Sequence, residues 1–167
     1  GQEAMRLGRL TRYSADDAAA AMEVLASSGM EFEHILNGAT EAALALAAAT
    51  GGDVKEAASI LAGALSMFGL TGAQAKDAVD GMAAAINNSL MSMSEFRMAL
   101  QAGGAMAAAY KWEIDEVSTV LGMFAKNGIK GSDAGTQMAR MLQYLQGNSK
   151  AAKEALAELG IITADGK

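Results

Sequence analysis

The sequence contains no cysteine and no proline in 167 residues. Without thiols, the chain has no disulfides, iron–sulfur clusters, cysteine-ligated zinc sites or cysteine nucleophiles. Average proline usage of about 5% would give roughly eight prolines at this length. Folds rich in loops and β-turns rarely avoid proline, whereas helix interiors exclude it. The missing proline therefore favours a helical protein.

Positive charge and aromatic side chains are also scarce. The 13 Lys and Arg are outnumbered by 19 Asp and Glu, which gives a net charge of −6, and 5% of residues are aromatic. An acidic chain is not expected to bind nucleic acid in general, because such binding needs cationic surface. His34 is the only histidine, so no His-Glu-x-x-His zinc site can form.

Neither the carboxylate pairs nor the glycines mark a catalytic centre. Asp16 and Asp17 suit the positive end of a helix dipole, and the other acidic pairs are typical of solvated helix faces. The glycine-rich stretch 128–135 lacks the Walker pattern and has no strand before it. We therefore expect no catalytic residue, no cofactor, no metal site and no enzymatic activity.

Alanine occurs 38 times and methionine 12 times, and both favour helices. A short helical stretch at residues 3–10 is followed by segments in which apolar residues recur at helical spacing. We expect about eight short to medium helices and no sheet. Five are expected at residues 15–28, 32–49, 54–68, 73–87 and 113–126, another from about Glu95 through Ala107, another from Ser132 or Asp133 through Leu145, and a last from Ser149 to before Gly160.

Caps and glycines set the predicted boundaries of these helices. Expected N-caps include Asp53 and Ser94. Glycines close the preceding helices, and an apolar residue follows three of them. The capping residues are Ser14, Asp53, Ser94, Ser132 or Asp133, and Ser149, and the closing positions are Gly29-Met30, Gly51, Gly69-Leu70 and Gly128-Ile129. This pattern predicts an all-α fold of helical hairpins.

The hairpins show a weak internal repeat. Residues 65, 69, 72, 82 and 86 match residues 124, 128, 131, 141 and 145 at a constant offset of 59. The repeat indicates a possible duplication, although any pair of glycine-terminated helical hairpins looks similar. Residues 88–93 form the predicted linker, so that residues 1–88 and 94–167 are possible sub-units of one helical segment.

The longest charge-free run covers 19 residues, from Ala57 to Ala75. Its length would allow a bilayer crossing. However, serine, threonine, glutamine and the Gly69/Gly72 break interrupt it. A buried hairpin is the expected structure, and a membrane-active segment is the alternative.

Several stretches resemble the phage tail tape measure proteins. The most specific one runs from Gly128-Ile129 through Gly131, Ala134, Gly135 and Thr136 to Leu142. Segments 25–30, 43–60 around Gly51 and Asp53, 79–85 with Ser89, and 160–166 also match, in the correct order. Tyr110-Lys111-Trp112 departs from the small residues of the family pattern.

This resemblance implies a structural segment from the N-terminal part of a long helical protein. Tail-tube subunits polymerise around such proteins, whose length sets the tail length. The implied partners are tail-tube subunits, tail assembly chaperones and other copies of the same chain, with membrane contact possible at genome ejection. The implied location is the lumen of the virion tail tube, and the host cytoplasm during assembly. No catalytic residues are associated with the matching segment.

Overall fold

The computed structural model describes residues 13–145 together with residues 154 and 158. This part of the chain is helical and contains no strand, which confirms the all-α prediction. The elements are α2 (Ala15–Ser27), α3 (Phe32–His34), η1 (Ile35–Ala39), α4 (Thr40–Thr50), α5 (Val54–Phe68), η2 (Gly72–Gln74), α6 (Ala75–Asn87), α7 (Met93–Ala109), α8 (Ile114–Lys126) and α9 (Gly131–Leu145). The predicted helices at 3–10 and 149–159 fall largely outside the described residues.

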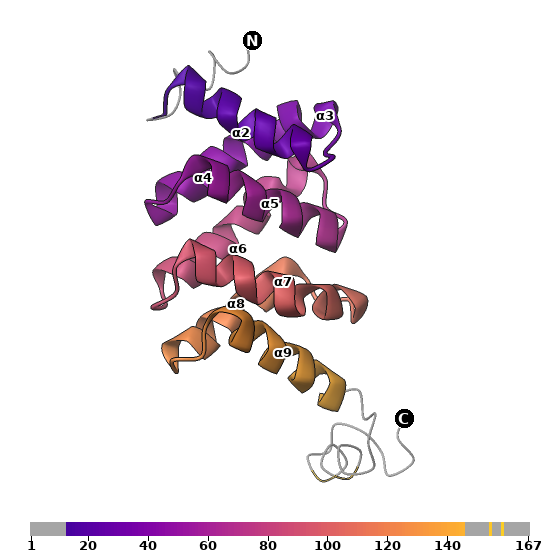
Figure 1. The fold of residues 1–167 in the computed structure, drawn as a ribbon. Coiled ribbons are helices and arrows are strands. Elements are labelled where there is room, and N and C mark those ends of the chain that lie inside the picture. Colours follow the sequence, from indigo (N-terminus) through magenta and orange to yellow (C-terminus); the bar gives the residue numbers. More distant parts are fainter. Residues whose placement is uncertain (1–12, 146–153, 155–157, 159–167) are drawn as a thin grey trace.

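The helices stack in two columns (Figure 1). In one column α2 packs on α5, α5 on α7 and α7 on α9. In the other, α4 packs on α6 and α6 on α8. Each helix therefore contacts the helix two places along the chain. The turns consequently alternate between two edges of the stack, with the ends of α2, α5 and α7 on one edge.

The stacking period is shorter than the sequence repeat. Helices α5, α7 and α9 begin at residues 54, 93 and 131, so they are 39 and 38 residues apart. The offset of 59 instead relates α5 and α6 to α8 and α9, which run across the stack in opposite directions. The buried residues form one cluster that continues from residues 13–88 into residues 94–145.

The core is built mainly from alanine and leucine. Among residues 13–145, eleven large side chains are fully or almost fully buried, including Phe96, Leu61 and Met82. Most other core positions are alanines, each of which buries only a small apolar area. The helices therefore approach one another closely, while each contact between helices contributes modest stability.

Three predicted boundaries are wrong. The segment 32–49 is not one helix, because Asn37 and Gly38 leave helical geometry and Gly38 has φ of 116°. This kink lets the backbone at residues 34–38 pack directly against Gly72. Helix α7 begins at Met93, with Ser92 rather than Ser94 as its N-cap, because Ser92 and Glu95 form a capping box. Helix α9 begins at Gly131, which places Ser132 and Asp133 within its first turn.

Candidate functional site

Four helices end in the same turn, in which a left-handed residue is followed by an apolar one. The left-handed residues are Gly29 (φ 83°), Gly69 (φ 65°), Lys111 (φ 65°) and Gly128 (φ 81°). In each turn the next residue donates its N–H to the carbonyl five residues earlier. These bonds are Met30 to Leu25, Leu70 to Leu65, Trp112 to Ala107 and Ile129 to Phe124, at 2.8–3.3 Å. This is the Schellman motif, which satisfies helix-terminal carbonyl groups.

Lys111 differs from the other three left-handed residues because it is not a glycine, but its turn has the same geometry. Tyr110-Lys111-Trp112 departs from the small residues of the family pattern, yet the structure has the same turn there. A lysine in the left-handed region is sterically penalised, whereas glycine is not. One sequence feature could have predicted this turn: Trp112 is an apolar residue at the position that Leu70 and Ile129 occupy after their helices.

Gly51 and Asp53 define a related turn, on the edge opposite the turns at Gly29, Gly69 and Lys111. Gly51 has φ of 66°, and Gly52 donates to the carbonyl of Ala47. Asp53 is the N-cap of α5, as predicted, and its carboxylate accepts a 2.9 Å bond from the Glu56 N–H. The chain thus reverses between α4 and α5 within three residues.

Two capping carboxylates have altered acidity. The backbone N–H of Ser14 donates to Asp17, and this bond lowers the pKa of Asp17. The backbone N–H of Ser92 donates to Glu95 in the same way and lowers the pKa of Glu95. The Ser92 hydroxyl and the charge of Lys130 lower the Glu95 pKa further, against the effect of desolvation.

The family-motif residues of α9 form its contact with α7. Gly135 is buried, and a Cβ atom there would lie 2.1 Å from the backbone oxygen of Ala99. A Cβ atom at Gly103 on α7 would lie 2.3 Å from the oxygen of Gly135. Ala134 is also buried, whereas Thr136 is exposed. The two helices therefore touch through their backbones, and Gly131 (φ 58°) starts α9 beside this contact.

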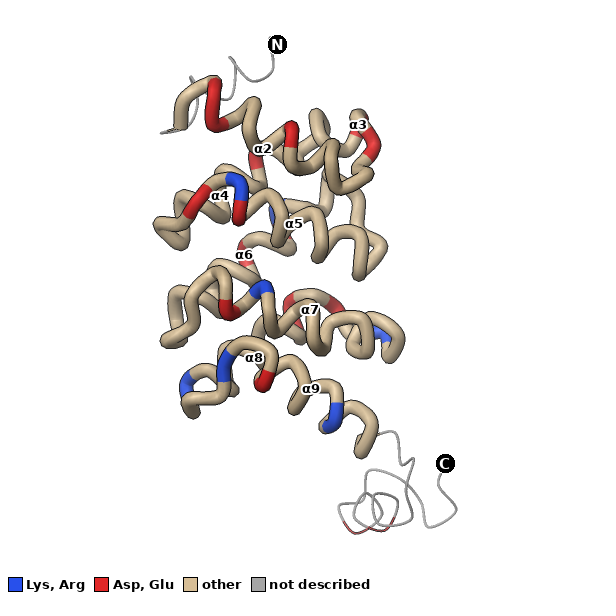
Figure 2. Tube along the Cα trace, in the orientation of Figure 1, with Lys and Arg blue, Asp and Glu red and all other residues tan. Residues whose placement is uncertain are grey.

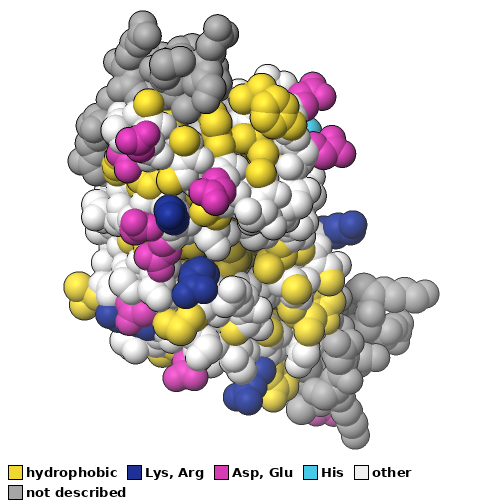
Figure 3. Space-filling model, turned by 45° about the horizontal axis from the view of Figure 1, so that its top comes forward, with side chains coloured by type: hydrophobic (Ala, Val, Ile, Leu, Met, Phe, Trp, Pro, Cys, Tyr) yellow, Lys and Arg dark blue, Asp and Glu magenta, His cyan; other side chains and the backbone are white. Residues whose placement is uncertain are grey.

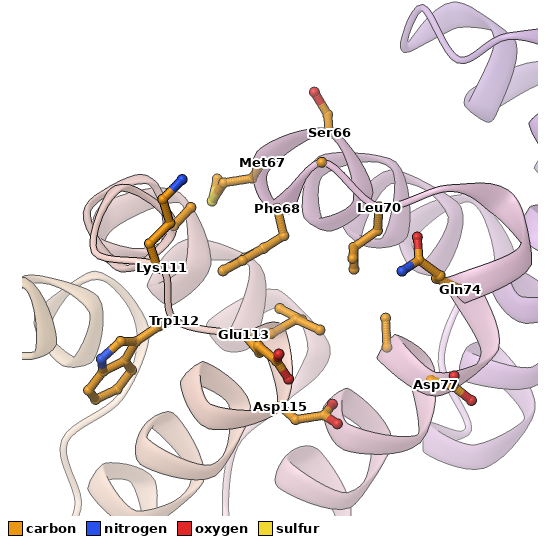
Figure 4. A pocket seen from close by; sticks show the side chains of 14 residues that line it. Ser66, Met67, Phe68, Leu70, Gln74, Asp77, Lys111, Trp112, Glu113 and Asp115 are labelled. Atoms are coloured by element: carbon orange, nitrogen blue, oxygen red, sulfur yellow. The ribbon is translucent and has the colours of Figure 1, made fainter.

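A hollow lies between two of the Schellman turns (Figure 4). This cleft, with a volume of about 730 Å³, separates the α5–α6 turn from the α7–α8 turn. Its apolar lining includes Phe68, Leu70 and Ile114. The carboxylates of Asp77, Glu113 and Asp115 lie along one side, with Lys111 as its one basic residue. It is therefore an apolar hollow with an acidic wall.

The α2–α4 end of the stack is strongly acidic. Residues 13–54 contain seven Asp and Glu and no Lys or Arg, and Figure 2 shows only acidic colouring around α2 and α3. Phe32 on α3 is 71% exposed, and Figure 3 shows hydrophobic side chains near the histidine at this end. His34 itself is half-buried.

The described residues hold no group of three His, Cys, Asp or Glu side chains arranged to bind a metal ion. Within the same part of the chain, no single helix is both long and apolar enough to cross a membrane. Helix α5 and the segment from Gly72 to Asn87 pass that test only as a pair, with a bend of 117° between them. This bend is at the Gly69–Gly72 break within the charge-free run.

The sequence matches a known protein family and known individual proteins. The family of phage-related minor tail proteins matches residues 1–167. The tape measure protein of Pneumococcus phage Dp-1 is 34% identical over 159 residues. The chain belongs to the phage tail tape measure family. The probable tape measure protein of Escherichia phage P2 is 31% identical over 166 residues.

These relatives are much longer than the tape measure segment described here. The matches cover 95% of the chain but 14% of the Dp-1 protein, and 99% of the chain but 20% of the P2 protein. The chain thus spans about one seventh to one fifth of the relatives' lengths. No solved structure matches it.

Proposed function

We propose that this segment is a structural module of a tape measure protein that acts in tail assembly and in setting tail length. In this proposal the stack is the form present in the host cytoplasm, and it opens into extended helix in the tail-tube lumen. Tail-tube subunits, assembly chaperones and other copies of the chain then cover the apolar faces that the stack buries. The proposed role uses no catalytic residue, cofactor or metal.

The observation that supports opening is the combination of tight turns with a complete lack of proline. Proline would block helix formation through a turn, but no turn in this chain contains one. The left-handed residues at the ends of α2, α5 and α8 are glycines, which also adopt helical geometry. Each turn can therefore convert to helix without a steric block.

The packing also supports an exchange of partners. Helices α7 and α9 meet at Gly103 and Gly135, and α6 meets α8 where Ala85 faces Gly122. Interfaces between such small residues bury little apolar area, so a partner surface can replace them at modest cost. As one continuous helix, 167 residues would span about 250 Å.

Deletion of residues 1–167 in frame from the parent gene tests this proposal. Electron microscopy of the resulting particles measures tail length. We expect tails shortened by about 250 Å, because each helical residue contributes about 1.5 Å. Tails of unchanged length would show that the segment does not contribute to length. Complete loss of tails would contradict the proposed role in setting tail length, and would support the proposed role in tail assembly.

A further inference from the structure

We propose that the cleft between the α5–α6 and α7–α8 turns binds residues 5–12 of a second copy of this chain. The inference deepens the proposed assembly role, from which it takes its biological meaning, by assigning a self-association site. The cleft offers both an apolar surface and negative charge, so its occupant must combine apolar side chains with positive charge.

The apolar part of the cleft is exposed to a partner. Phe68 and Leu70 line the hollow and are only half-buried, and Ile114, a buried residue at the start of α8, also lines it. A volume of about 730 Å³ is within the range of ligand pockets and accommodates several side chains. In Figure 4 the Phe68 ring points into this space.

The acidic wall gives the cleft a net negative charge. Asp77 and Asp115 are both exposed, from α6 and α8 respectively. Asp115 lies close to α6, because a Cβ atom at Gly81 would be 2.2 Å from its Oδ1 atom. Glu113 adds a third carboxylate at the N-cap of α8, where its backbone N–H donates to the Glu116 side chain. Lys111 offsets one of these charges.

Residues 5–12 have the complementary chemistry. Their sequence is Met-Arg-Leu-Gly-Arg-Leu-Thr-Arg, in which Arg6, Arg9 and Arg12 alternate with apolar residues. Residues 1–12 contain three arginines and one glutamate, whereas the rest of the chain has ten basic and 18 acidic residues. The charges of the chain are therefore segregated, and opposite charge steers such surfaces together.

The position of this segment favours a second copy over the same chain. Tyr13 adjoins the N-terminal end of α2, which lies on the edge of the stack opposite the cleft (Figure 1). The cleft lies at the C-terminal ends of α5 and α7, further along the column. Binding between copies places each basic segment on a partner's cleft.

Sedimentation velocity of the full chain at rising concentration and low salt tests the inference. We expect the native chain to self-associate. Two charge-reversal variants should each weaken association about tenfold or more. The cleft variant carries Asp77→Arg and Asp115→Arg, and the segment variant carries Arg6→Glu, Arg9→Glu and Arg12→Glu. An equimolar mixture of the two variants should restore it, because reversed segments then meet reversed clefts. Asp77→Asn with Asp115→Asn provides a milder variant, and circular dichroism checks folding.

The matched control is Glu31→Arg with Glu33→Arg, which reverses two exposed carboxylates beside exposed Phe32 on the acidic end of the stack. It should leave association unchanged. A native chain that stays monomeric, a control that weakens association equally, or a mixture that stays dissociated would each overturn the inference. Shortened tails after the deletion above, together with a monomeric chain, would reject this site and retain the proposed function.

Discussion

Helix α7 packs against one neighbour through backbone and against the other through side chains. On the α9 side, the space at Gly103 is bounded by the backbone oxygen of Gly135. On the α5 side, the space at Gly104 is bounded by the sulfur of Met67 and by Leu100. A backbone contact cannot adapt, whereas a methionine side chain can. The α7–α9 contact is therefore fixed in geometry, and the α5–α7 contact is adaptable.

The difference indicates where the stack separates first. Contacts that depend on close backbone approach are lost together when helices move apart, whereas side-chain contacts loosen gradually. We expect the α5–α7 contact to loosen before the α7–α9 contact. The α5–α7 contact also lies beside the cleft, at the point where a partner would bind.

The largest expected effect is at Gly135. Gly135→Ala places a methyl group 2.1 Å from the Ala99 oxygen, so α7 and α9 must separate. We expect the free energy of unfolding to fall by about 2–3 kcal/mol. Gly104→Ala is the matched control on the adaptable side, and it should cost less than about 1 kcal/mol because Met67 can move. Equal losses in denaturant titrations would contradict the comparison.

Gly128→Val tests a turn without involving a packed interface. Nothing lies within 4 Å of a Cβ atom at Gly128, but its φ of 81° penalises a β-branched residue. We expect a destabilisation of about 1 kcal/mol or more from the backbone alone. Gly63→Ala, on an exposed and open helical position, should instead stabilise slightly. An unchanged melting temperature for Gly128→Val would show that the turn does not form.

Ser92→Ala tests the cap at the start of α7. Loss of the N-cap should cost about 1 kcal/mol. The pKa of Glu95 is lower in the folded chain, so the unfolded chain binds a proton more readily at this residue. The stability that the ionised Glu95 contributes is therefore present above its unfolded pKa and is lost as pH falls through its folded pKa. Ser92→Ala keeps the backbone N–H that binds Glu95, so the test uses Glu95→Gln, which removes the titrating group and should lose less stability than the native chain as pH falls from about 5. Parallel pH curves would contradict this.

Lys111→Gly has the smallest expected effect, and its sign is opposite. The substitution gives the α7–α8 turn the residue that the other Schellman turns have, and removes the strain of a left-handed lysine. We expect stabilisation by about 0.5–1 kcal/mol. Lys126→Gly, the same change at the last residue of α8, should destabilise slightly, because Lys126 already has helical geometry. Thermal melts of both variants give the comparison directly.

The sequence predicted the helices and their glycine turns because these depend on local chemistry. Apolar spacing and Asp53 as a cap were sufficient for α5, and Gly128 took the left-handed conformation expected of it. The kink at Asn37 and Gly38 was missed because it depends on the approach of Gly72, a contact distant in sequence. The two-column stack and the cleft were also missed, because both arise from packing between helices. The Ser92 cap was available locally but was overlooked.

The most direct test of opening uses the absence of cysteine in the native chain. A Cβ atom at Gly122 would lie 3.5 Å from the Cβ atom of Ala85, a spacing that suits a disulfide between α6 and α8. Ala85→Cys with Gly122→Cys should cross-link within the free folded chain under mild oxidation. In one continuous helix the two positions would be about 55 Å apart. We predict no intramolecular cross-link in purified tails; a cross-link as efficient as in the free chain would contradict the account.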